Sequence, residues 1–340
     1  MYAAIAAIEY YLPEKLLTNE QLAVEFPDWS VEKIEEKTGI TCRHVAGKDE
    51  CSSDLGFEAA ELLLHRHDIA RETIDYLLFC TQSPDYFLPT TACLLQSRLG
   101  LPDNIGAFDF NLGCSGYVYG LGIAKGLIET GQAQNVLLIT AETYTKFIHP
   151  GDKSVRTLFG DAGAATLLKT VYDCLIPPIG PFVYGTDGRG GGNLIVPSGG
   201  LRKPPTPDQI LEIDDQGNTR TEQNLYMNGA EVFTFTLDSV PKSVFTLLER
   251  AGKTLNDIDL FVFHQANRFM LEHLRRKIKI SHDKFYVSFK EYGNTVSSTI
   301  PIALADAQAE GRIKQGDLVM LVGFVVGYSW GATIVRWGDV

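Results

Sequence analysis

The chain has 340 residues, of which 45% are hydrophobic and 21% charged, and its formal net charge at pH 7 is −12. This composition is typical of a globular protein with a large core, and about 150 residues per domain predicts two units. The negative charge argues against general binding to nucleic acids or to anionic membranes. No apolar run approaches the roughly 20 residues of a membrane span. The apolar start at residues 1–8 lacks a basic leader, so it predicts a strand and not a signal peptide.

The cysteines are scattered, and no two of them have C-x-x-C spacing. They stand at positions 42, 51, 80, 93, 114 and 174. In a chain of this length the pattern predicts reduced thiols in a cytoplasmic compartment. No group of His, Cys and acidic residues has the spacing of a metal site, and we expect neither a metal nor a bound cofactor.

Hydrophobic periodicity predicts alternating strands and helices in the first half. Apolar runs predict strands at residues 5–12, 74–80 and 135–140. Helical spacing and capping residues predict helices at 20–26 (after Asn19), 30–37 (before Gly39), 53–66 and 90–99. A continuous apolar run such as 74–80 is typical of a strand buried on both faces of a sheet.

A further helix is predicted from Cys114 to about Thr130, after the short strand-like run 107–110 and a turn at 112–113. This places Cys114 in the first helical turn, where free N–H groups and the helix dipole lower the pKa of a thiol. The alternative is a buried cysteine that only packs. Four glycines in the helix predict that it lies against other backbones, in the middle of the molecule.

Proline and glycine pairs between residues 177 and 208 indicate long connections between two halves. We therefore divide the chain into 1–176 and 177–340, with 177–226 as connecting and surface loops. A strong amphipathic helix is predicted at 228–250. The run 258–264 repeats the layout of 74–80, which predicts a duplicated α/β unit with two sheets; chance similarity of buried strands is the alternative.

Three polar residues stand where predicted strands end: Cys114, His264 and Asn294. Ligands collect at the carboxyl ends of strands in open α/β sheets, so all three are predicted to face one crevice. Singly, His264 could be a hydrogen-bonded core residue and Asn294 a turn or helix cap. Together they form a Cys–His–Asn set, which is a known arrangement for nucleophilic catalysis.

The sequence resembles the β-ketoacyl-acyl-carrier-protein synthase III family of thiolase-like condensing enzymes. The matching segments run in family order across nearly the whole chain: 114–116 (CSG), 159–165 (FGDAGAA), 227–233 (MNGAEVF), 264–267 (HQAN), 293–295 (GNT), 311–317 (GRIKQGD) and 330–332 (WGA). The resemblance implies an α/β fold of five layers, αβαβα, with two duplicated halves in a homodimer.

The resemblance also implies a decarboxylative Claisen condensation. Cys114 would accept an acyl group from a thioester, and a malonyl thioester would then bind and lose CO₂. His264 and Asn294 would donate hydrogen bonds to the enolate oxygen. The backbone N–H groups of Cys114 and the Val326 loop would hold the second oxyanion. Substrates would arrive as phosphopantetheine or coenzyme A thioesters, with no resident cofactor.

Substrate contacts are implied at Leu88, Phe159, Asn267, Val325 and Val326. Family members carry a glycine run where this chain has Val325 and Val326, so we expect a reshaped acyl pocket. Leu88 aligns with a size-setting residue that crosses the dimer interface, and a leucine there is compatible with a starter other than acetyl.

The coenzyme A adenine shelf of the family aligns near Lys33, which is not aromatic, and this favours a carrier-protein thioester. Basic residues after the histidine motif form a docking patch for an acidic carrier protein, or simply a solvated helix face: Arg268, Arg275, Arg276 and Lys277. Two other functions remain open. One is acyl transfer to an alcohol or amine without decarboxylation, and the other is a non-catalytic binding subunit.

Overall fold

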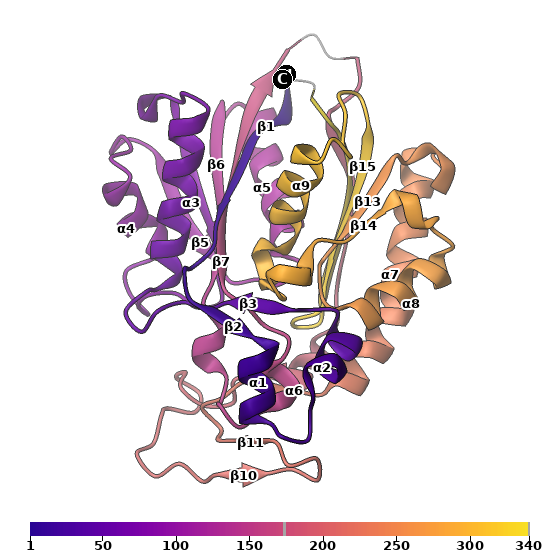
Figure 1. Ribbon diagram of the computed structural model, residues 1–340. Coiled ribbons are helices and arrows are strands. Elements are labelled where there is room, and N and C mark those ends of the chain that lie inside the picture. Colours follow the sequence, from indigo (N-terminus) through magenta and orange to yellow (C-terminus); the bar gives the residue numbers. More distant parts are fainter. Residues whose placement is uncertain (173–174, 339–340) are drawn as a thin grey trace.

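The computed structural model describes residues 1–172 and 175–338. Two mixed five-stranded sheets stand face to face with helices outside and between them, giving five layers (Figure 1). This confirms the predicted αβαβα arrangement of two related halves. Cys174, one of the predicted reduced thiols, lies outside the described residues.

The first sheet has the strand order β1-β7-β6-β4-β5. Its strands are β1 (Tyr2–Tyr11), β4 (Tyr76–Cys80), β5 (Gly106–Phe110), β6 (Asn135–Glu142) and β7 (Ala162–Val171). The second sheet has the order β14-β13-β15-β16-β8. Its strands are β8 (Ile179–Thr186), β13 (Leu260–Phe263), β14 (Phe285–Tyr286), β15 (Leu318–Phe324) and β16 (Ser329–Arg336).

The two sheets follow the same pairing scheme. In the first, β4 pairs in parallel with both β5 and β6, while β7 is antiparallel to β6 and β1. In the second, β13 pairs in parallel with both β14 and β15, while β16 is antiparallel to β15 and β8. The sequence echo between residues 74–80 and 258–264 therefore reflects equivalent strands, β4 and β13.

The larger helices form the three helical layers (Figure 1). The outer layer beside the first sheet contains α3 (Ser52–Arg66) and α4 (Thr91–Arg98). The layer between the sheets contains α5 (Gly116–Glu129) and α9 (Thr299–Ala309). The outer layer beside the second sheet contains α7 (Gly229–Ala251) and α8 (Arg268–Ile278).

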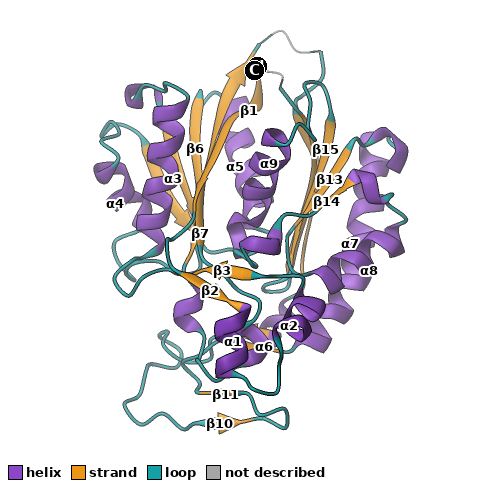
Figure 2. Cartoon of the chain, in the orientation of Figure 1, coloured by secondary structure: helices purple, strands orange, loops and turns teal. Residues whose placement is uncertain are grey.

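A loop-rich region closes one end of the layers, at the bottom of Figure 2. Its elements are β2 (Leu16–Thr18), α1 (Asn19–Glu25), α2 (Val31–Thr38), β3 (Cys42–His44), α6 (Lys153–Arg156), β9 (Leu194–Ile195), β10 (Glu212–Ile213), β11 (Thr219–Arg220) and β12 (Tyr226–Met227). The segment 177–226, expected to be connecting and surface loops, thus also supplies strand β8 of the second sheet and short strands near the site.

Several predicted boundaries shift for physical reasons. Thr18, and not Asn19, caps α1, because the Thr18 hydroxyl accepts the N–H of Gln21. The Asn19 side chain is buried and donates to the carbonyl of Ile40. The strand before Asn294 is short, because β14 ends at Tyr286 and residues 289–291 form a 3-10 turn.

The central position of α5 is confirmed, but its glycines contact side chains and not backbones. A Cβ at Gly116 would lie 2.3 Å from Cys80 Sγ, and a Cβ at Gly120 would lie 2.7 Å from Leu138 Cδ1. At Gly126 there is open space, because a Cβ there would have nothing within 4 Å. The helix therefore needs small residues near its start, and less so near its end.

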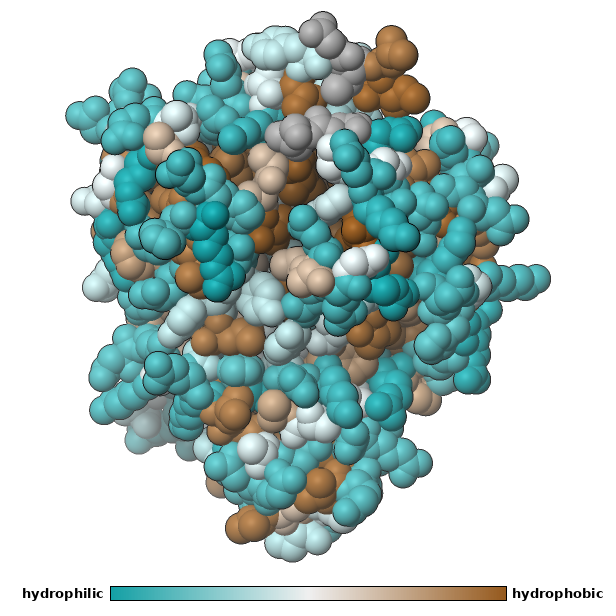
Figure 3. Space-filling view, turned by 45° about the horizontal axis from the view of Figure 1, so that its top comes forward, coloured by the Kyte–Doolittle hydropathy of each residue, from teal (hydrophilic) through white to brown (hydrophobic). Residues whose placement is uncertain are grey.

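Hydrophilic side chains predominate on the surface in Figure 3, and the hydrophobic ones form separate patches. Within residues 1–172 and 175–338, no helix combines the length and apolar character needed to cross a membrane.

Candidate active site

Cys114 lies in the turn between β5 and α5, just before the helix. Helix α5 begins at Gly116 with Ser115 in the capping position, so the prediction that Cys114 occupies the first helical turn is wrong by two residues. The turn is closed by the N–H of Gly116, which donates to the carbonyl of Gly113 at 2.7 Å. Gly323 at the end of β15 packs against this turn, and a Cβ there would lie 2.7 Å from the Cys114 carbonyl oxygen.

The predicted lowering of the Cys114 pKa is also wrong. The side chain is buried, and burial raises the pKa of the thiol, with a further increase from the carboxyl group of Glu142. The backbone N–H groups of Cys114 and Val326 act on the sulfur in the opposite direction. Desolvation outweighs them, so the resting side chain is the neutral thiol and its proton must leave during the reaction.

His264 follows the end of β13 and is completely buried. Its N–H donates to the carbonyl of Val322 at 2.8 Å, which continues the ladder between β13 and β15. Burial lowers the pKa of the imidazole to about 3, so the ring is neutral. Nδ1 lies 2.8 Å from Thr299 Oγ1, whereas Nε2 has no hydrogen-bond partner among the described residues.

Asn294 lies in a tight turn held against the segment 158–160. Its N–H donates to the carbonyl of Leu158 at 2.9 Å, and its own carbonyl accepts the N–H of Gly160 at 3.1 Å. Gly293 before it has a φ of +74°, a left-handed conformation that favours glycine. Asn294 Oδ1 accepts the N–H of Val296 at 2.9 Å, so the amide Nδ2 remains available as a donor.

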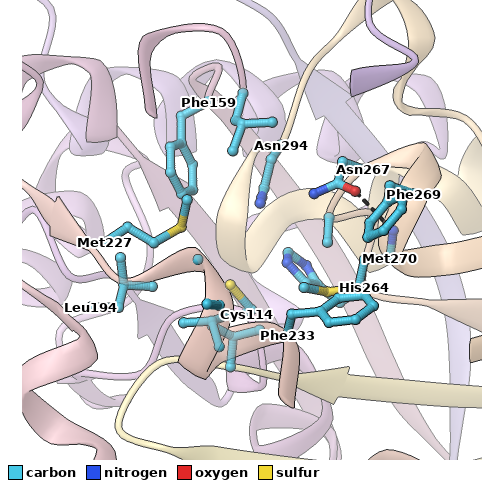
Figure 4. Close-up of a pocket in the computed structure, with 16 residues that line it drawn as sticks. Cys114, Phe159, Leu194, Met227, Phe233, His264, Asn267, Phe269, Met270 and Asn294 are labelled. Carbon is cyan, nitrogen blue, oxygen red and sulfur yellow. Dashed lines mark hydrogen bonds between the residues drawn. The ribbon is translucent and has the colours of Figure 1, made fainter. Parts of the chain in front are cut away.

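These three side chains line one cavity of about 360 Å³ (Figure 4). Apolar side chains make up most of its wall, and none of the described residues that line it carries a charge. Phe233 from α7 and Phe269 from α8 also line it, with ring centroids 5.1 Å apart. Phe269 is 55% exposed, which places this aromatic pair where the cavity meets the surface.

Of the predicted substrate contacts, Phe159, Asn267 and Val325 line this cavity. Asn267 also caps α8, because its Oδ1 accepts the N–H of Met270 at 2.9 Å. Val326 lines an adjoining cavity of about 810 Å³ instead. Leu88 lines neither and is 86% exposed, next to the exposed aromatic residues of the same loop.

The loop between β15 and β16 brings the Val326 N–H to Cys114. Val325 has a φ of +142°, a conformation that β-branched residues rarely adopt, so the loop is strained there. Ser329 Oγ donates to the carbonyl of Val326 at 2.8 Å and lies 2.7 Å from Ser115 Oγ. Ser115, the serine of the CSG segment, and Ser329, which lies in none of the matching segments, thereby tie the loop to the start of α5.

Glu142 is a further site residue that no sequence motif singled out. It is completely buried at the end of β6, and its carboxyl group accepts hydrogen bonds from Gln82 N at 3.0 Å and from Ser297 Oγ at 2.9 Å. Ser297 belongs to the turn that carries Asn294. Burial raises the pKa of Glu142 to about 8. A neutral carboxyl group thus connects β6 to the Asn294 turn.

The predicted docking residues all lie on α8, whose first turn borders the cavity: Arg268, Arg275, Arg276 and Lys277. The Arg275 side chain is only 18% exposed and forms an ion pair with Glu272. Arg276 is 72% exposed and pairs with the same carboxylate. The exposed part of the patch is therefore smaller than the sequence predicts.

Lys33, near which the aromatic shelf of the family aligns, has an aromatic side chain beside it. The ammonium groups of Lys33 and Lys37 lie 5.5 Å and 4.6 Å from the ring centroid of Trp29. Among the described residues there is no group of three or more His, Cys, Asp or Glu side chains that could hold a metal ion.

Two family models match the chain. The model of 3-oxoacyl-[acyl-carrier-protein] synthase III covers residues 108–188, and the model of its C-terminal part covers residues 248–337. The β-ketoacyl-[acyl-carrier-protein] synthase III of Caldanaerobacter subterraneus subsp. tengcongensis is 38% identical over 98% of both chains. The enzyme of the same name from Campylobacter fetus is 38% identical over 99% of this chain and 98% of its own.

Solved structures give the same result. A 3-oxoacyl-(acyl-carrier-protein) synthase III matches with a TM-score of 0.98 and 52% identity, over 99% of this chain and all of the other. The synthase III of Thermus thermophilus matches with a TM-score of 0.88 and 38% identity over 99% of this chain and 100% of its own. The priming β-ketosynthase of the R1128 polyketide pathway matches with a TM-score of 0.84 and 27% identity, over 98% of this chain and 96% of the other. The chain belongs to the 3-oxoacyl-[acyl-carrier-protein] synthase III family.

Proposed function

We propose that this enzyme transfers an acyl group to Cys114 and joins it to a malonyl unit carried by acyl carrier protein, with release of CO₂, in fatty-acid biosynthesis. The main observation in support of this proposal is that the side chains of Cys114, His264 and Asn294 line one uncharged cavity. A thiol, an imidazole and a primary amide there supply one nucleophile and two neutral donors.

In the first half-reaction, Cys114 Sγ attacks the carbonyl carbon of an acyl thioester. The bond to the carrier sulfur breaks, and the carrier thiol leaves with a proton equivalent to the one that Cys114 gave up. The backbone N–H groups of Cys114 and Val326, which act on the sulfur in the resting protein, are the donors available to the carbonyl oxygen.

In the second half-reaction, the carbon–carbon bond to the malonyl carboxylate breaks and CO₂ leaves. Negative charge develops on the thioester oxygen, where His264 Nε2 and Asn294 Nδ2 donate hydrogen bonds. The enolate carbon attacks the acyl carbonyl, the bond to Cys114 Sγ breaks, and the released thiolate regains a proton. A neutral imidazole suffices for this role, in agreement with the lowered pKa of His264.

The substrates bring their own phosphopantetheine arm, as carrier-protein or coenzyme A thioesters, and the proposal needs no resident cofactor. The partners are an acidic acyl carrier protein and a second copy of this chain. Exposed Tyr86, Phe87 and Leu88 follow one another beside the cavity that Val326 lines, and this favours a homodimer that covers them. The five described cysteines are free thiols, which favours the cytoplasm.

Acyl transfer to an alcohol or amine on the same scaffold is the second candidate function. Transfer to an alcohol or amine needs only a base beside Cys114, whereas condensation gives the unpartnered Nε2 of His264 and the free amide of Asn294 a joint role in holding an enolate oxygen. The mass of the product separates the two functions, since a β-ketoacyl product requires loss of CO₂ and an ester or amide does not.

Intact-mass analysis after incubation with a panel of acyl thioesters tests the first half-reaction. We expect one acyl group on the native chain and on Cys93→Ala, which removes an exposed thiol, and none on Cys114→Ala. The acyl group bound most completely identifies the starter. Acylation of Cys114→Ala to the native extent would contradict the nucleophile assignment.

Malonyl decarboxylation tests the second half-reaction. Removing one oxyanion donor typically slows a reaction about 100-fold or more, so we expect at least this loss for His264→Ala, with Cys114 still acylated. The measurement is CO₂ release from a malonyl thioester. Decarboxylation at the native rate by His264→Ala would refute the donor role.

A further inference from the structure

The proposed function requires a proton on His264 Nε2. The hydrogen bonds around the imidazole determine which of its two nitrogens carries that proton. The buried ring is neutral. A neutral imidazole carries one proton on one of its two nitrogens, and the hydrogen bond made by the other nitrogen fixes which one. Nε2 faces the cavity without a partner among the described residues, so the outcome depends on Nδ1.

The hydrogen-bond partner of Nδ1 is the hydroxyl group of Thr299, 2.8 Å away, at the start of α9. Both residues are almost completely buried, so no bulk water competes for this contact. The hydroxyl has one proton and two acceptors within reach, Nδ1 and the carbonyl oxygen of Val296 at 3.0 Å. If the hydroxyl group donated its hydrogen bond to the Val296 carbonyl, its oxygen would accept a hydrogen bond from Nδ1–H. Nε2 would then carry no proton and could not act as a donor.

The Val296 carbonyl does not depend on the hydroxyl proton. The backbone N–H of Thr299 already donates to the same oxygen and closes the 3-10 turn at residues 296–298. The Thr299 hydroxyl can therefore donate to Nδ1 without leaving a buried carbonyl unsatisfied. An imidazole nitrogen without a proton also requires a donor in this dry environment, and Thr299 supplies it.

The same turn orients the second donor. The backbone N–H of Val296 holds Asn294 Oδ1 at 2.9 Å, which leaves the amide Nδ2 as the free end. Val296 has a φ of +55°, an unfavourable conformation for a β-branched residue, so the surrounding structure imposes this turn. One short segment, residues 294–299, thus contacts both His264 Nδ1 and Asn294 Oδ1.

We propose that Thr299 is a positioning residue whose hydroxyl donates to His264 Nδ1 and thereby fixes the Nε2–H tautomer that faces the cavity. This inference rests on the proposed function for its catalytic meaning, but the tautomer itself is a property of the unliganded protein. Thr299 touches no substrate and acts through the imidazole.

The tautomer is read directly by ¹⁵N–¹H NMR of the unliganded full chain labelled at histidine, with His264→Ala used to assign the signal. We expect a proton on Nε2 and an unprotonated Nδ1. A proton on Nδ1 would overturn the proposal, whatever reaction the enzyme catalyses. This experiment needs no Thr299 variant, so a folding defect cannot leave the question open.

Activity of two variants tests the consequence. Thr299→Val keeps the shape and removes the hydroxyl, and we expect malonyl decarboxylation to fall about 10- to 100-fold, up to the cost of losing one oxyanion donor. Thr299→Ser keeps the hydroxyl and should stay within about threefold of the native rate. Acylation of Cys114, followed by intact mass, should change by less than about threefold in both variants.

The two proposals fail in different ways. If the native chain does not decarboxylate malonyl thioesters, the proposed function is wrong while the NMR result still decides the tautomer. If the native chain is active and Thr299→Val decarboxylates at the native rate, the positioning role is wrong. An equal loss of acylation and decarboxylation in Thr299→Val would likewise overturn it, because that result indicates general damage to the site.

Discussion

At the scale of single residues, the carboxyl group of Glu142 links the two halves of the site through hydrogen bonds. Its carboxyl group accepts hydrogen bonds from Gln82 and Ser83 of the first half and from Ser297 of the second. Burial raises its pKa to about 8, so it is mostly protonated at neutral pH. A neutral Glu142 also avoids the repulsion that its charge would exert on a Cys114 thiolate.

This raised pKa predicts how stability depends on pH. The folded chain holds a proton on Glu142 that the unfolded chain releases above the ordinary pKa of 4.5, so stability is lost as pH rises toward about 8. His264 contributes a slope of the opposite sign, because its pKa is lowered from 6.5 to about 3, and this contribution fades as pH rises above 6.5. As pH rises from 6.5 to about 8, we expect the free energy of unfolding to fall by at most about 1.4 kcal/mol per pH unit.

Urea unfolding at several pH values between 6.5 and 8 measures this slope. Glu142→Gln resembles the protonated side chain and should flatten the slope. An equal slope in the native chain and the variant would show that Glu142 does not titrate in this range.

The sequence was sufficient to predict that Cys114, His264 and Asn294, which stand in short local motifs, face one cavity. It was not sufficient to predict hydrogen bonds between residues far apart in the chain. Ser115 and Ser329 are 214 positions apart, and Glu142 and Ser297 are 155 positions apart. The pKa of Cys114 was predicted in the wrong direction because the helix dipole is visible in a local pattern, whereas desolvation depends on the whole fold.

At the scale of elements, α5 shows that glycines in one helix can have different roles. A methyl group at Gly116 would collide with Cys80 Sγ. This thiol is buried and donates a hydrogen bond to the carbonyl of Leu112 at 3.0 Å. A methyl group at Gly126 meets nothing within 4 Å. The sequence pattern predicts the helix and its central place correctly, but glycine positions alone do not show which of them are sterically required.

Two substitutions in α5 test this difference. Gly126→Ala should stabilise the chain by up to about 1 kcal/mol, through helix propensity alone. Gly116→Ala should destabilise it, because Cys80 cannot move freely, and should slow acylation of the neighbouring Cys114. Denaturant midpoints and intact mass after acylation measure the two effects. Equal changes in stability for both variants would contradict the steric account.

At the scale of the whole molecule, the charge distribution favours an approach along α8. The chain carries a net charge of −12, yet the helix that begins at the cavity ends in three consecutive cations, Arg275, Arg276 and Lys277. Glu272 pairs with the first two. Arg276 and Lys277 are the more exposed of the three, and an acidic carrier protein that docks along α8 would meet them at the end of the helix away from the cavity.

Reversing both charges tests the docking role. Arg276→Glu with Lys277→Glu should lower kcat/KM for carrier-protein thioesters at least tenfold at low salt, and leave coenzyme A thioesters within about twofold. The matched control is Lys253→Glu with Lys314→Glu, two exposed lysines outside α8 with the same change in net charge. Equal losses in the two double variants would indicate an effect of net charge and not a docking surface.

The duplicated α/β unit with two sheets was readable from sequence because strand and helix periodicity repeats in both halves, whereas the five-layer order was implied by the family resemblance. The sharing of a cavity wall between α7, α8, β9 and β12 was not, since short strands such as Leu194–Ile195 leave little pattern.

The uncharged wall of the cavity has a consequence for which acids can be starters. A carboxylate that enters finds no cation among the described residues of the wall to balance it, and burying an unpaired charge is costly. The malonyl carboxylate is lost as neutral CO₂ during the reaction, whereas the far carboxylate of a succinyl chain would stay buried. We therefore expect dicarboxylic acids to be poor starters because of the composition of the wall, without any residue dedicated to rejecting them.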